Sequence, residues 1–175
     1  EDLRIVLKDL SGGARGALAL VSGRPVAQLD SLFSPLKLSL IGCHGAEMRI
    51  LPDSSVMRRA PLDNAVRSEL HALAARFPGT LLEDKGFSIA IHYRAALKQE
   101  GALLHAAQEF VCAHAELEWL AGKAVIEFKR PGYDKATACT ELLRHEPFAG
   151  RRPLFLGDDV TDEAVFRALP QFSGI

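Results

Sequence analysis

Four carboxylates stand close together near the end of the sequence, within Asp158-Asp159-Val160-Thr161-Asp162-Glu163. The apolar run Leu154-Phe155-Leu156, followed by Gly157, comes directly before them and predicts a buried strand of a parallel sheet. In open α/β sheets, ligands bind beyond the carboxyl ends of the strands, which is where Asp158 and Asp159 stand. Mg²⁺ takes one or two protein carboxylates together with phosphate and water oxygens, and it would offset the repulsion between these acids. The run therefore predicts a magnesium site, and the alternative is a helix cap surrounded by solvated acids.

Two further groups in the sequence suit the binding of a phosphate. Ser22-Gly23-Arg24 follows the apolar run from Ala17 to Val21, and a hydroxyl with backbone amides at a helix N-terminus binds phosphate oxygens. Lys135 stands in the first turn of a helix predicted from Asp134 to about Arg144. A lysine there opposes the helix dipole, which indicates an anion nearby. Taken singly, Ser22 could be a cap, Lys135 a surface lysine and Arg24 the partner of a surface acid.

The elements that would position these groups form an α/β pattern. Leu3, Val6, Leu7 and Leu10 predict a helix that ends at Ser11-Gly12-Gly13. Strands are predicted at 17–21 and 38–43, and a helix beginning at Pro25 separates them, with its inner face made by Val26, Leu29, Leu32 and Phe33. Strand, helix and strand within about thirty residues is the pattern of a βαβ unit.

The middle of the chain has a different pattern. From residue 57 to residue 129 the order is helix, two strands, helix and two strands, which predicts an α+β module with its helices on one face of an antiparallel sheet. Arg130-Pro131-Gly132 then reads as a return linker. The predicted organisation is a core at 1–56 and 130–175, interrupted by an inserted cap at 57–129.

Composition limits the function classes. The net charge of −1 gives no general attraction to nucleic acid or to an anionic membrane, and no apolar run is long enough to span a bilayer. The three cysteines lack any CxxC pairing and the six histidines form no HExxH motif, so the residues argue for reduced thiols in a cytoplasmic protein and against zinc. The expected partner is a small molecule, with no nucleic acid and no membrane, and the sequence predicts nothing about oligomeric state.

Taken together, the motifs resemble those of the haloacid-dehalogenase-like phosphatases, and in detail the chain is similar to the trehalose-6-phosphate phosphatases. The stretches that carry the resemblance are Leu18 to Arg24, His44-Gly45-Ala46-Glu47, Lys85-Gly86, His92-Tyr93-Arg94, Lys123 to Glu127, and Gly157 to Glu163. The resemblance implies a Rossmann-like parallel-sheet core with an inserted α+β cap. It also implies Mg²⁺-dependent hydrolysis of trehalose 6-phosphate to trehalose and phosphate.

The resemblance also assigns roles to residues. It implies that Ser22 and Lys135 hold the phosphoryl group, with Gly23 and Arg24 in the same phosphate-binding loop. Asp158 would bind Mg²⁺ with support from Asp159 and Asp162, and Asp159 would join Ser22 and Lys135 in the catalytic group. The hydroxyls of the sugar would be bound by Glu47 and, from the cap, by Lys123 and Glu127, which are predicted to share one strand and one face.

One part of the family pattern is not found in this sequence. The family's chemistry begins on a strand that ends in a DxDGT-like motif, whose first aspartate attacks phosphorus, and nothing in Glu1 to Gly16 has that pattern. We therefore expect the nucleophile strand to be absent from this chain. Two alternatives stay open: a phosphatase for another sugar phosphate, such as that of sucrose or a mannosyl sugar, and a non-catalytic domain that binds sugar phosphate or a partner enzyme.

Overall fold

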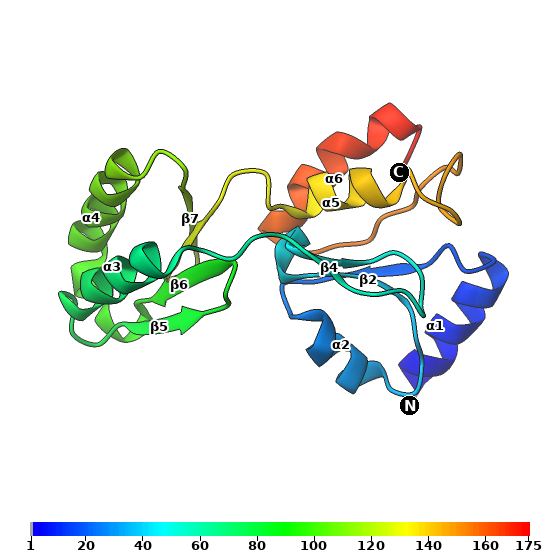
Figure 1. Cartoon of the computed structure of the whole chain (residues 1–175), viewed down its shortest axis with the longest axis horizontal. Coiled ribbons are helices and arrows are strands. Elements are labelled where there is room, and N and C mark those ends of the chain that lie inside the picture. The colour runs from blue at the N-terminus through cyan, green and yellow to red at the C-terminus, as the bar shows by residue number, and fades with distance from the viewer. Residues whose placement is uncertain (1) are drawn as a thin grey trace. The chain divides into compact units, whose positions relative to one another are not determined.

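The computed structural model describes residues 2–175, which divide into two compact units. The first unit is Glu1–Arg59 together with Tyr133–Ile175, and the second is Ala60–Gly132 (Figure 1). Among the described residues, no helix has the length and apolar character needed to cross a membrane.

The first unit begins with the predicted βαβ arrangement. Helix α1 (Asp2–Gly13) precedes strand β1 (Ala19–Val21), helix α2 (Val26–Phe33) and strand β2 (Ser39–Gly42). Strands β1 and β2 are parallel, and Ala19 lies beside Ser39 in their register. Pro25 stands directly before α2, where its fixed φ suits the start of a helix. The βαβ prediction is confirmed.

The rest of the first unit completes a four-stranded sheet and a helical layer. The remaining elements are η1 (Cys43–Gly45), β3 (Glu47–Arg49), β4 (Met57–Arg58), α5 (Lys135–Leu142), η3 (Val160–Asp162), α6 (Glu163–Ala168) and η4 (Leu169–Phe172). The strand order is β1-β2-β3-β4, and both β2–β3 and β3–β4 are antiparallel. Among the described strands of this unit, the expected parallel sheet is therefore limited to the pair β1–β2.

Successive residues of β2 point to opposite faces of this sheet and define two apolar cores. Leu40 packs with Val26 and Leu29 of α2, whereas Ile41 packs with Ala138 and Leu142 of α5. The sheet is thus covered by α1 and α2 on one face and by α5 on the other. One detail of the predicted inner face of α2 is wrong, because Leu32 is 48% exposed. In α1, which forms as predicted, Leu7 is buried whereas Leu3, Val6 and Leu10 face solvent.

The apolar run before the carboxylates is not the predicted buried strand. Residues 151–158 belong to no helix or strand, and Leu154 and Leu156 are 67% and 84% exposed. The segment makes a single pair of backbone bonds with the end of the chain, since Phe155 N donates to Ile175 O at 2.9 Å and Ile175 N donates to Pro153 O at 3.1 Å. An apolar run forms a buried strand only when neighbouring strands make backbone hydrogen bonds with it. Among residues 2–175, no strand pairs with residues 154–156.

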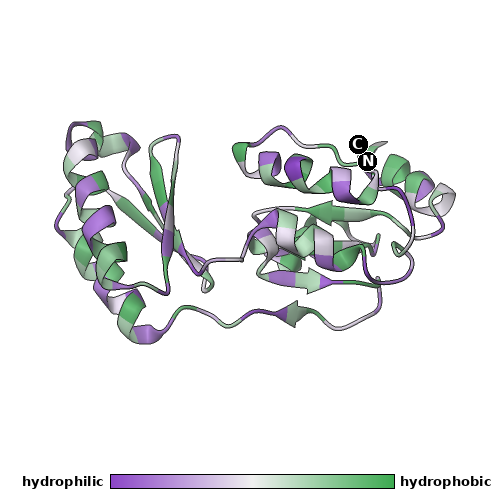
Figure 2. Cartoon of the chain, turned by 90° about the horizontal axis from the view of Figure 1, so that it is seen from above, coloured by the Kyte–Doolittle hydropathy of each residue, from purple (hydrophilic) through white to green (hydrophobic). Residues whose placement is uncertain are grey.

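The second unit has the predicted α+β order. Its elements are α3 (Asn64–Ala75), β5 (Leu81–Asp84), β6 (Ser88–His92), η2 (Arg94–Gln99), α4 (Glu100–Ala113), β7 (Glu118–Gly122) and β8 (Val125–Lys129). The strands form an antiparallel sheet in the order β5-β6-β8-β7. Apolar and polar residues alternate around α3 and α4, as the green and purple bands in Figure 2 show.

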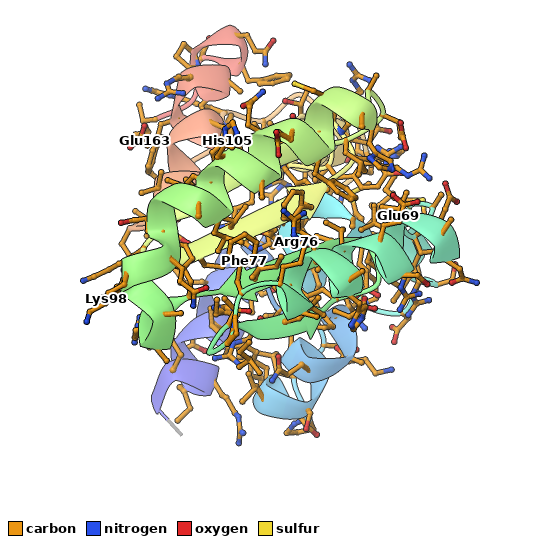
Figure 3. All side chains as sticks on the ribbon, turned by 90° about the vertical axis from the view of Figure 1, so that its left-hand side faces the viewer. Glu69, Arg76, Phe77, Lys98, His105 and Glu163 are labelled. Atoms are coloured by element: carbon orange, nitrogen blue, oxygen red, sulfur yellow. The ribbon has the colours of Figure 1, made fainter. Side chains whose placement is uncertain are left out.

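Both helices of the second unit lie on one face of this sheet, as predicted. Figure 3 shows α3, which ends near Arg76 and Phe77, and α4, which carries His105, crossing in front of the strands. Ile89 of β6 and Phe128 of β8 are fully buried beneath them. The opposite face of the sheet carries the alternate residues of the same strands.

A partly buried ion pair joins α2 to the sheet of the first unit. The guanidinium of Arg49 in β3 donates to both carboxylate oxygens of Asp30 in α2, at 2.8 and 2.6 Å, and also to Leu38 O. The side chain of Arg49 is 8% exposed and that of Asp30 is 40% exposed. Bidentate geometry makes this a strong charged hydrogen bond, which fixes the helix that begins after the Ser22 loop.

We expect Asp30→Ala to lower the free energy of unfolding by about 1–3 kcal/mol, because it leaves a buried guanidinium with only a carbonyl partner. Urea unfolding followed by circular dichroism measures the change. The matched control is Lys37→Ala, which removes an ion pair between side chains that are 66% and 83% exposed, and which should leave the midpoint nearly unchanged. Equal losses in the two variants would show that Arg49 does not depend on Asp30.

Candidate active site

A buried ion pair connects two of the predicted site residues. Lys135 Nζ in the first turn of α5 donates to Asp162 Oδ1 in η3 at 2.7 Å, and each side chain is 7% exposed. The surface-lysine interpretation of Lys135 is therefore wrong. The position of Lys135 in the first helical turn indicated a nearby anion, and the carboxylate of Asp162 is one such anion. This contact leaves two of the three ammonium protons of Lys135 for other acceptors.

The second oxygen of Asp162 is also held by the protein. Asp159 N donates to Asp162 Oδ2 at 3.0 Å, within a capping box that begins η3. Burial acts to raise the pKa of Asp162, but the bonds from Lys135 and from the backbone N–H groups of Asp159 and Asp158 outweigh it and lower the pKa from 3.8. Gly157 permits this packing, because a Cβ there would lie 2.6 Å from the carboxylate of Asp162.

The Ser22 loop lies at the carboxyl ends of β1 and β2. Ser22 N continues the pairing of these strands by donating to Ile41 O at 2.9 Å, and Ser22 Oγ accepts a hydrogen bond from Arg24 N at 3.1 Å. The ring of His44 lies against Gly23, and His44 N donates to Ser22 O at 3.1 Å. The loop is thus fixed by η1, while the side chain of Arg24 is exposed.

Segment η1 connects the Ser22 loop to the helix that carries Lys135. Gly45 has a φ of +106°, and a Cβ at this position would collide with the carbonyl of Asp134. Asp134 caps α5, because its carboxylate accepts hydrogen bonds from Thr137 N at 2.8 Å and from Thr137 Oγ1 at 2.9 Å. A continuous set of contacts therefore joins Ser22, through η1 and the cap of α5, to Lys135 and then to Asp162.

Two exposed carboxylates, Asp158 and Asp159, remain as the candidate metal ligands in this unit. Among residues 2–175, no three side chains of His, Cys, Asp and Glu come together as a ready metal cluster. Mg²⁺ nevertheless needs only one or two protein carboxylates when phosphate and water complete its octahedron, so this pair fits the ion. Asp162, with both oxygens occupied by protein donors, fits a supporting role better than a ligand role. The capping alternative named Thr161 or Asp162 as the cap; in the structure the N-cap of η3 is Asp159, and Asp162 takes part as the third residue of the capping box.

Glu47, predicted to bind sugar, is 7% exposed in the structure. Its Oε2 accepts a hydrogen bond from Val26 N at 2.7 Å and its Oε1 accepts one from Arg58 Nε at 3.1 Å. The first of these bonds satisfies the N-terminal N–H of α2, which the sequence did not indicate because the two residues are far apart in the chain. The sugar-binding role of Glu47 stays a prediction.

The other two predicted sugar ligands belong to the second unit. Glu127 lies in β8 as expected, but Lys123 lies in the turn between β7 and β8. Ala124, which follows Lys123, has a φ of +59°, so the alternation of the strand does not extend back to Lys123. The prediction that the two residues share a strand is therefore wrong.

Cys139 is the thiol closest in sequence to Lys135, on the next turn of α5. Burial raises its pKa to about 12, despite the opposing effect of the Lys135 ammonium. A thiol with such a pKa is protonated at neutral pH and is a poor nucleophile.

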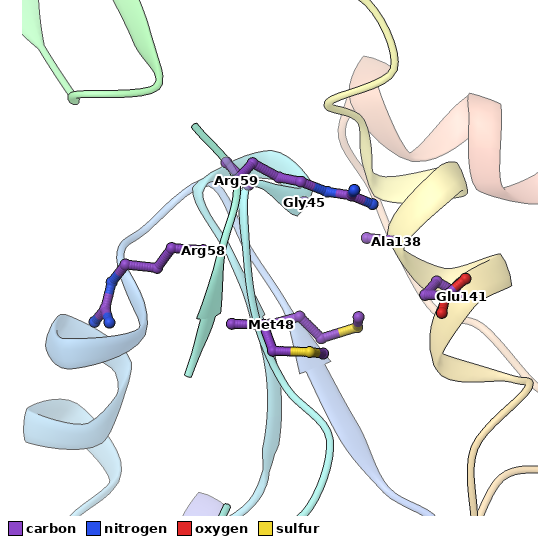
Figure 4. A pocket seen from close by; sticks show the side chains of 8 residues that line it. Gly45, Met48, Arg58, Arg59, Ala138 and Glu141 are labelled. Carbon is purple, nitrogen blue, oxygen red and sulfur yellow. The ribbon is translucent and has the colours of Figure 1, made fainter. Parts of the chain in front are cut away.

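A separate cavity lies between the β3–β4 hairpin and α5. Its volume is about 310 Å³; Glu141 of α5 lines it, and the side chain of Arg59 extends toward α5 near Ala138 (Figure 4). Neither Ser22, Lys135 nor the aspartates line it, so it is distinct from the candidate phosphate site.

The sequence of this chain was compared with those of known protein families. The sequence profile of the family described as trehalose-phosphatase matches residues 1–175. The chain belongs to the trehalose-phosphatase family. This confirms the resemblance carried by the motifs around Ser22, Glu47 and Asp158.

Individual relatives agree with this membership. The chain is similar to a trehalose-6-phosphate phosphatase of Escherichia coli (strain K12), with 37% identity over 171 residues that cover 97% of this chain. It is also similar to a probable trehalose-phosphate phosphatase of Sinorhizobium fredii (strain NBRC 101917 / NGR234), with 40% identity over 179 residues and 97% coverage. The chain spans 64% of the length of each of these relatives.

Solved structures establish the fold. The C-terminal domain of trehalose-6-phosphate phosphatase from C. albicans has a TM-score of 0.79 at 23% identity, covering 98% of this chain and 66% of that one. A haloacid dehalogenase-like hydrolase from Bacteroides thetaiotaomicron has a TM-score of 0.71 at 16% identity, covering 94% and 77%. The predicted haloacid-dehalogenase-like α/β fold is therefore confirmed.

The pair between Lys135 and Asp162 predicts how stability depends on pH. Because folding lowers the pKa of Asp162 from 3.8, the pair stabilises the fold above that pH and is lost as the pH falls through the lower, folded-state pKa. We expect Asp162→Asn to be less stable than the wild type at about pH 6 and the difference to shrink below about pH 4. Urea unfolding across this range measures it. A difference that stays constant with pH would contradict the ionised pair.

Proposed function

We propose that the protein containing this chain is a Mg²⁺-dependent phosphatase that hydrolyses trehalose 6-phosphate to trehalose and phosphate. The observation that carries the proposal is the buried Lys135–Asp162 pair, which holds an ammonium at the ligand-binding edge of the sheet, joined through η1 to the Ser22 loop. Family membership and the names of the relatives favour this substrate over another sugar phosphate.

Each group in the first unit has a part in binding the phosphoryl group. Ser22 Oγ and the backbone amide of Gly23 would donate to its oxygens, while Arg24 N, which donates to Ser22 Oγ, would hold that hydroxyl in place. Lys135 Nζ would add a positive charge held in place by Asp162. Asp158 and Asp159 would hold Mg²⁺, which, when bound, neutralises charge on the phosphate. Because these donors are fixed before the substrate arrives, they cost no reorganisation during the reaction.

The sugar would be recognised by other residues. We assign the hydroxyls of trehalose to Glu47 in the first unit and to Lys123 and Glu127 in the second, which we propose acts as a cap. This division would let the core bind any phosphate monoester while the cap selects the sugar. We place the enzyme in the cytoplasm, which agrees with the free thiols of Cys112 and Cys139.

The proposal needs an attacking carboxylate from outside these residues. The 175 residues contain no two aspartates separated by one residue, which is the arrangement that the family's first motif implies. Strand β1 lies at one end of its sheet, and among the described strands only β2 pairs with it. An additional strand could therefore pair with the open edge of β1 and bring its carboxylate to the edge where Ser22 stands.

We expect Lys135→Met, made in the full-length protein, to lower the turnover of trehalose 6-phosphate at least about 100-fold, the range for losing one preorganised donor. Phosphate release with Mg²⁺ measures it. The exposed Arg144, just beyond α5, provides the control, and Arg144→Ala should keep turnover within about twofold.

Folding must be separated from catalysis in this test, because the single substitution leaves the buried Asp162 without its ammonium. In the double variant Lys135→Met/Asp162→Leu an apolar pair replaces the ionic one, which is often neutral for stability. We expect this variant to regain the unfolding midpoint and to stay inactive. Near-normal turnover in a folded variant without Lys135 would exclude the proposed role.

A further inference from the structure

The face of the second unit's sheet opposite α3 and α4 carries a polar cluster around Glu127. Phe128 and Ile126 point toward the helices, so Glu127, which lies between them on β8, points to the other face. Ala90 of β6 lies directly beside Glu127, and Ser88 lies beside Lys129. Ser88 is therefore the diagonal cross-strand neighbour of Glu127, within reach of its side chain.

Two donors fix one oxygen of Glu127. Ser88 Oγ donates to Glu127 Oε1 at 2.6 Å, and Lys85 Nζ donates to the same oxygen at 3.3 Å. Ser88 is 8% exposed, and the side chains of Lys85 and Glu127 are 21% and 16% exposed. A carboxylate this far from water requires charged or hydroxyl donors, and bonds to a charged group are stronger than those between neutral groups.

The backbone that carries Lys85 is fixed in turn. Lys85 N donates to Ser88 O at 2.9 Å, and Gly86 N donates to Asp84 Oδ1 at 2.8 Å, which closes the turn between β5 and β6. Arg67 of α3 donates to the other oxygen of Asp84 at 2.9 and 2.5 Å. The ammonium of Lys85 is thereby held over the same sheet face as Ser88.

We propose that Ser88, with Lys85, is a positioning residue that orients Glu127 for the hydroxyls of the sugar and so sets the preference for a disaccharide phosphate. This inference rests on the proposed function, which gives Glu127 its substrate. An apolar residue could occupy the strand position of Ser88. The hydroxyl that stands there instead donates to Glu127 Oε1 and so fixes the direction of the carboxylate. A carboxylate held in one rotamer loses less entropy when it binds a hydroxyl.

The test compares two substrates in the full-length enzyme. Ser88→Ala should lower kcat/KM for trehalose 6-phosphate about tenfold, mainly through KM, and change that for p-nitrophenyl phosphate less than about twofold. Ser88→Thr keeps the hydroxyl and should retain most of the lost activity. The matched control is Ser68→Ala, at an exposed position of α3 in the same unit, which should behave as the wild type.

A double-variant cycle separates positioning from packing. Glu127→Gln should lose activity selectively on the disaccharide, and adding Ser88→Ala to it should cause little further loss, because the hydroxyl acts through the carboxylate. If Ser88→Ala proves unfolded by circular dichroism, Lys85→Met provides the same comparison. Equal loss on both substrates, no loss at all, or losses that add with Glu127→Gln would overturn the proposal.

The same measurements separate the proposed function from the proposed role of Ser88. If the wild type releases phosphate from trehalose 6-phosphate but Glu127→Gln shows no selective loss, the proposed function stands and the role of Ser88 is excluded. If the wild type hydrolyses p-nitrophenyl phosphate and leaves trehalose 6-phosphate intact, the proposed substrate is wrong, and the inference about Ser88 fails with it.

Discussion

The candidate active site depends on a lysine and an aspartate that have both been removed from water. Lys135 and Asp162 come from separate parts of the chain, and each is 7% exposed. Either charge alone would be costly to bury, so the first turn of α5 and the η3 segment are stable only when they lie together. The backbone N–H of Asp159 completes the arrangement on the second oxygen of the carboxylate. The fold therefore holds the ammonium in place before any ligand binds.

The surrounding elements connect this ion pair to the Ser22 loop. The parallel strands β1 and β2 end at the same edge, where Ser22 follows the first and η1 follows the second. Segment η1 touches the Ser22 loop through His44, whose N donates to Ser22 O, and it touches the N-terminus of α5 through Gly45, which lies against the carbonyl of Asp134. We propose that a hydroxyl, an ammonium and the exposed acids Asp158 and Asp159 act there on one phosphate, and that Asp162 mainly holds the lysine. In the second unit, too, neighbouring side chains fix a charged group: Ser88 and Lys85 both donate to Glu127 Oε1.

The sequence predicts local patterns here better than contacts between distant residues. The βαβ unit and the α+β module follow from apolar periodicity and turn residues, and the structure confirms both. The run 154–156 has the same apolar signal but no strand beside it, because pairing depends on neighbours that a local pattern cannot supply. The Lys135–Asp162 ion pair and the hydrogen bond from Val26 N to Glu47 each join residues more than twenty positions apart, which a local pattern does not indicate. The position of Lys123 depends on the unusual φ of the following alanine, which the sequence does not indicate.

A crystal structure of the full-length protein with Mg²⁺ and orthovanadate, a mimic of the phosphoryl group, would show whether Ser22 and Lys135 bind the same phosphoryl group. We predict vanadate oxygens at about 3 Å from both Ser22 Oγ and Lys135 Nζ, with Lys135 still bonded to Asp162 and the metal on Asp158. Vanadate bound away from Lys135, or a Lys135 that leaves Asp162 in the occupied site, would contradict it.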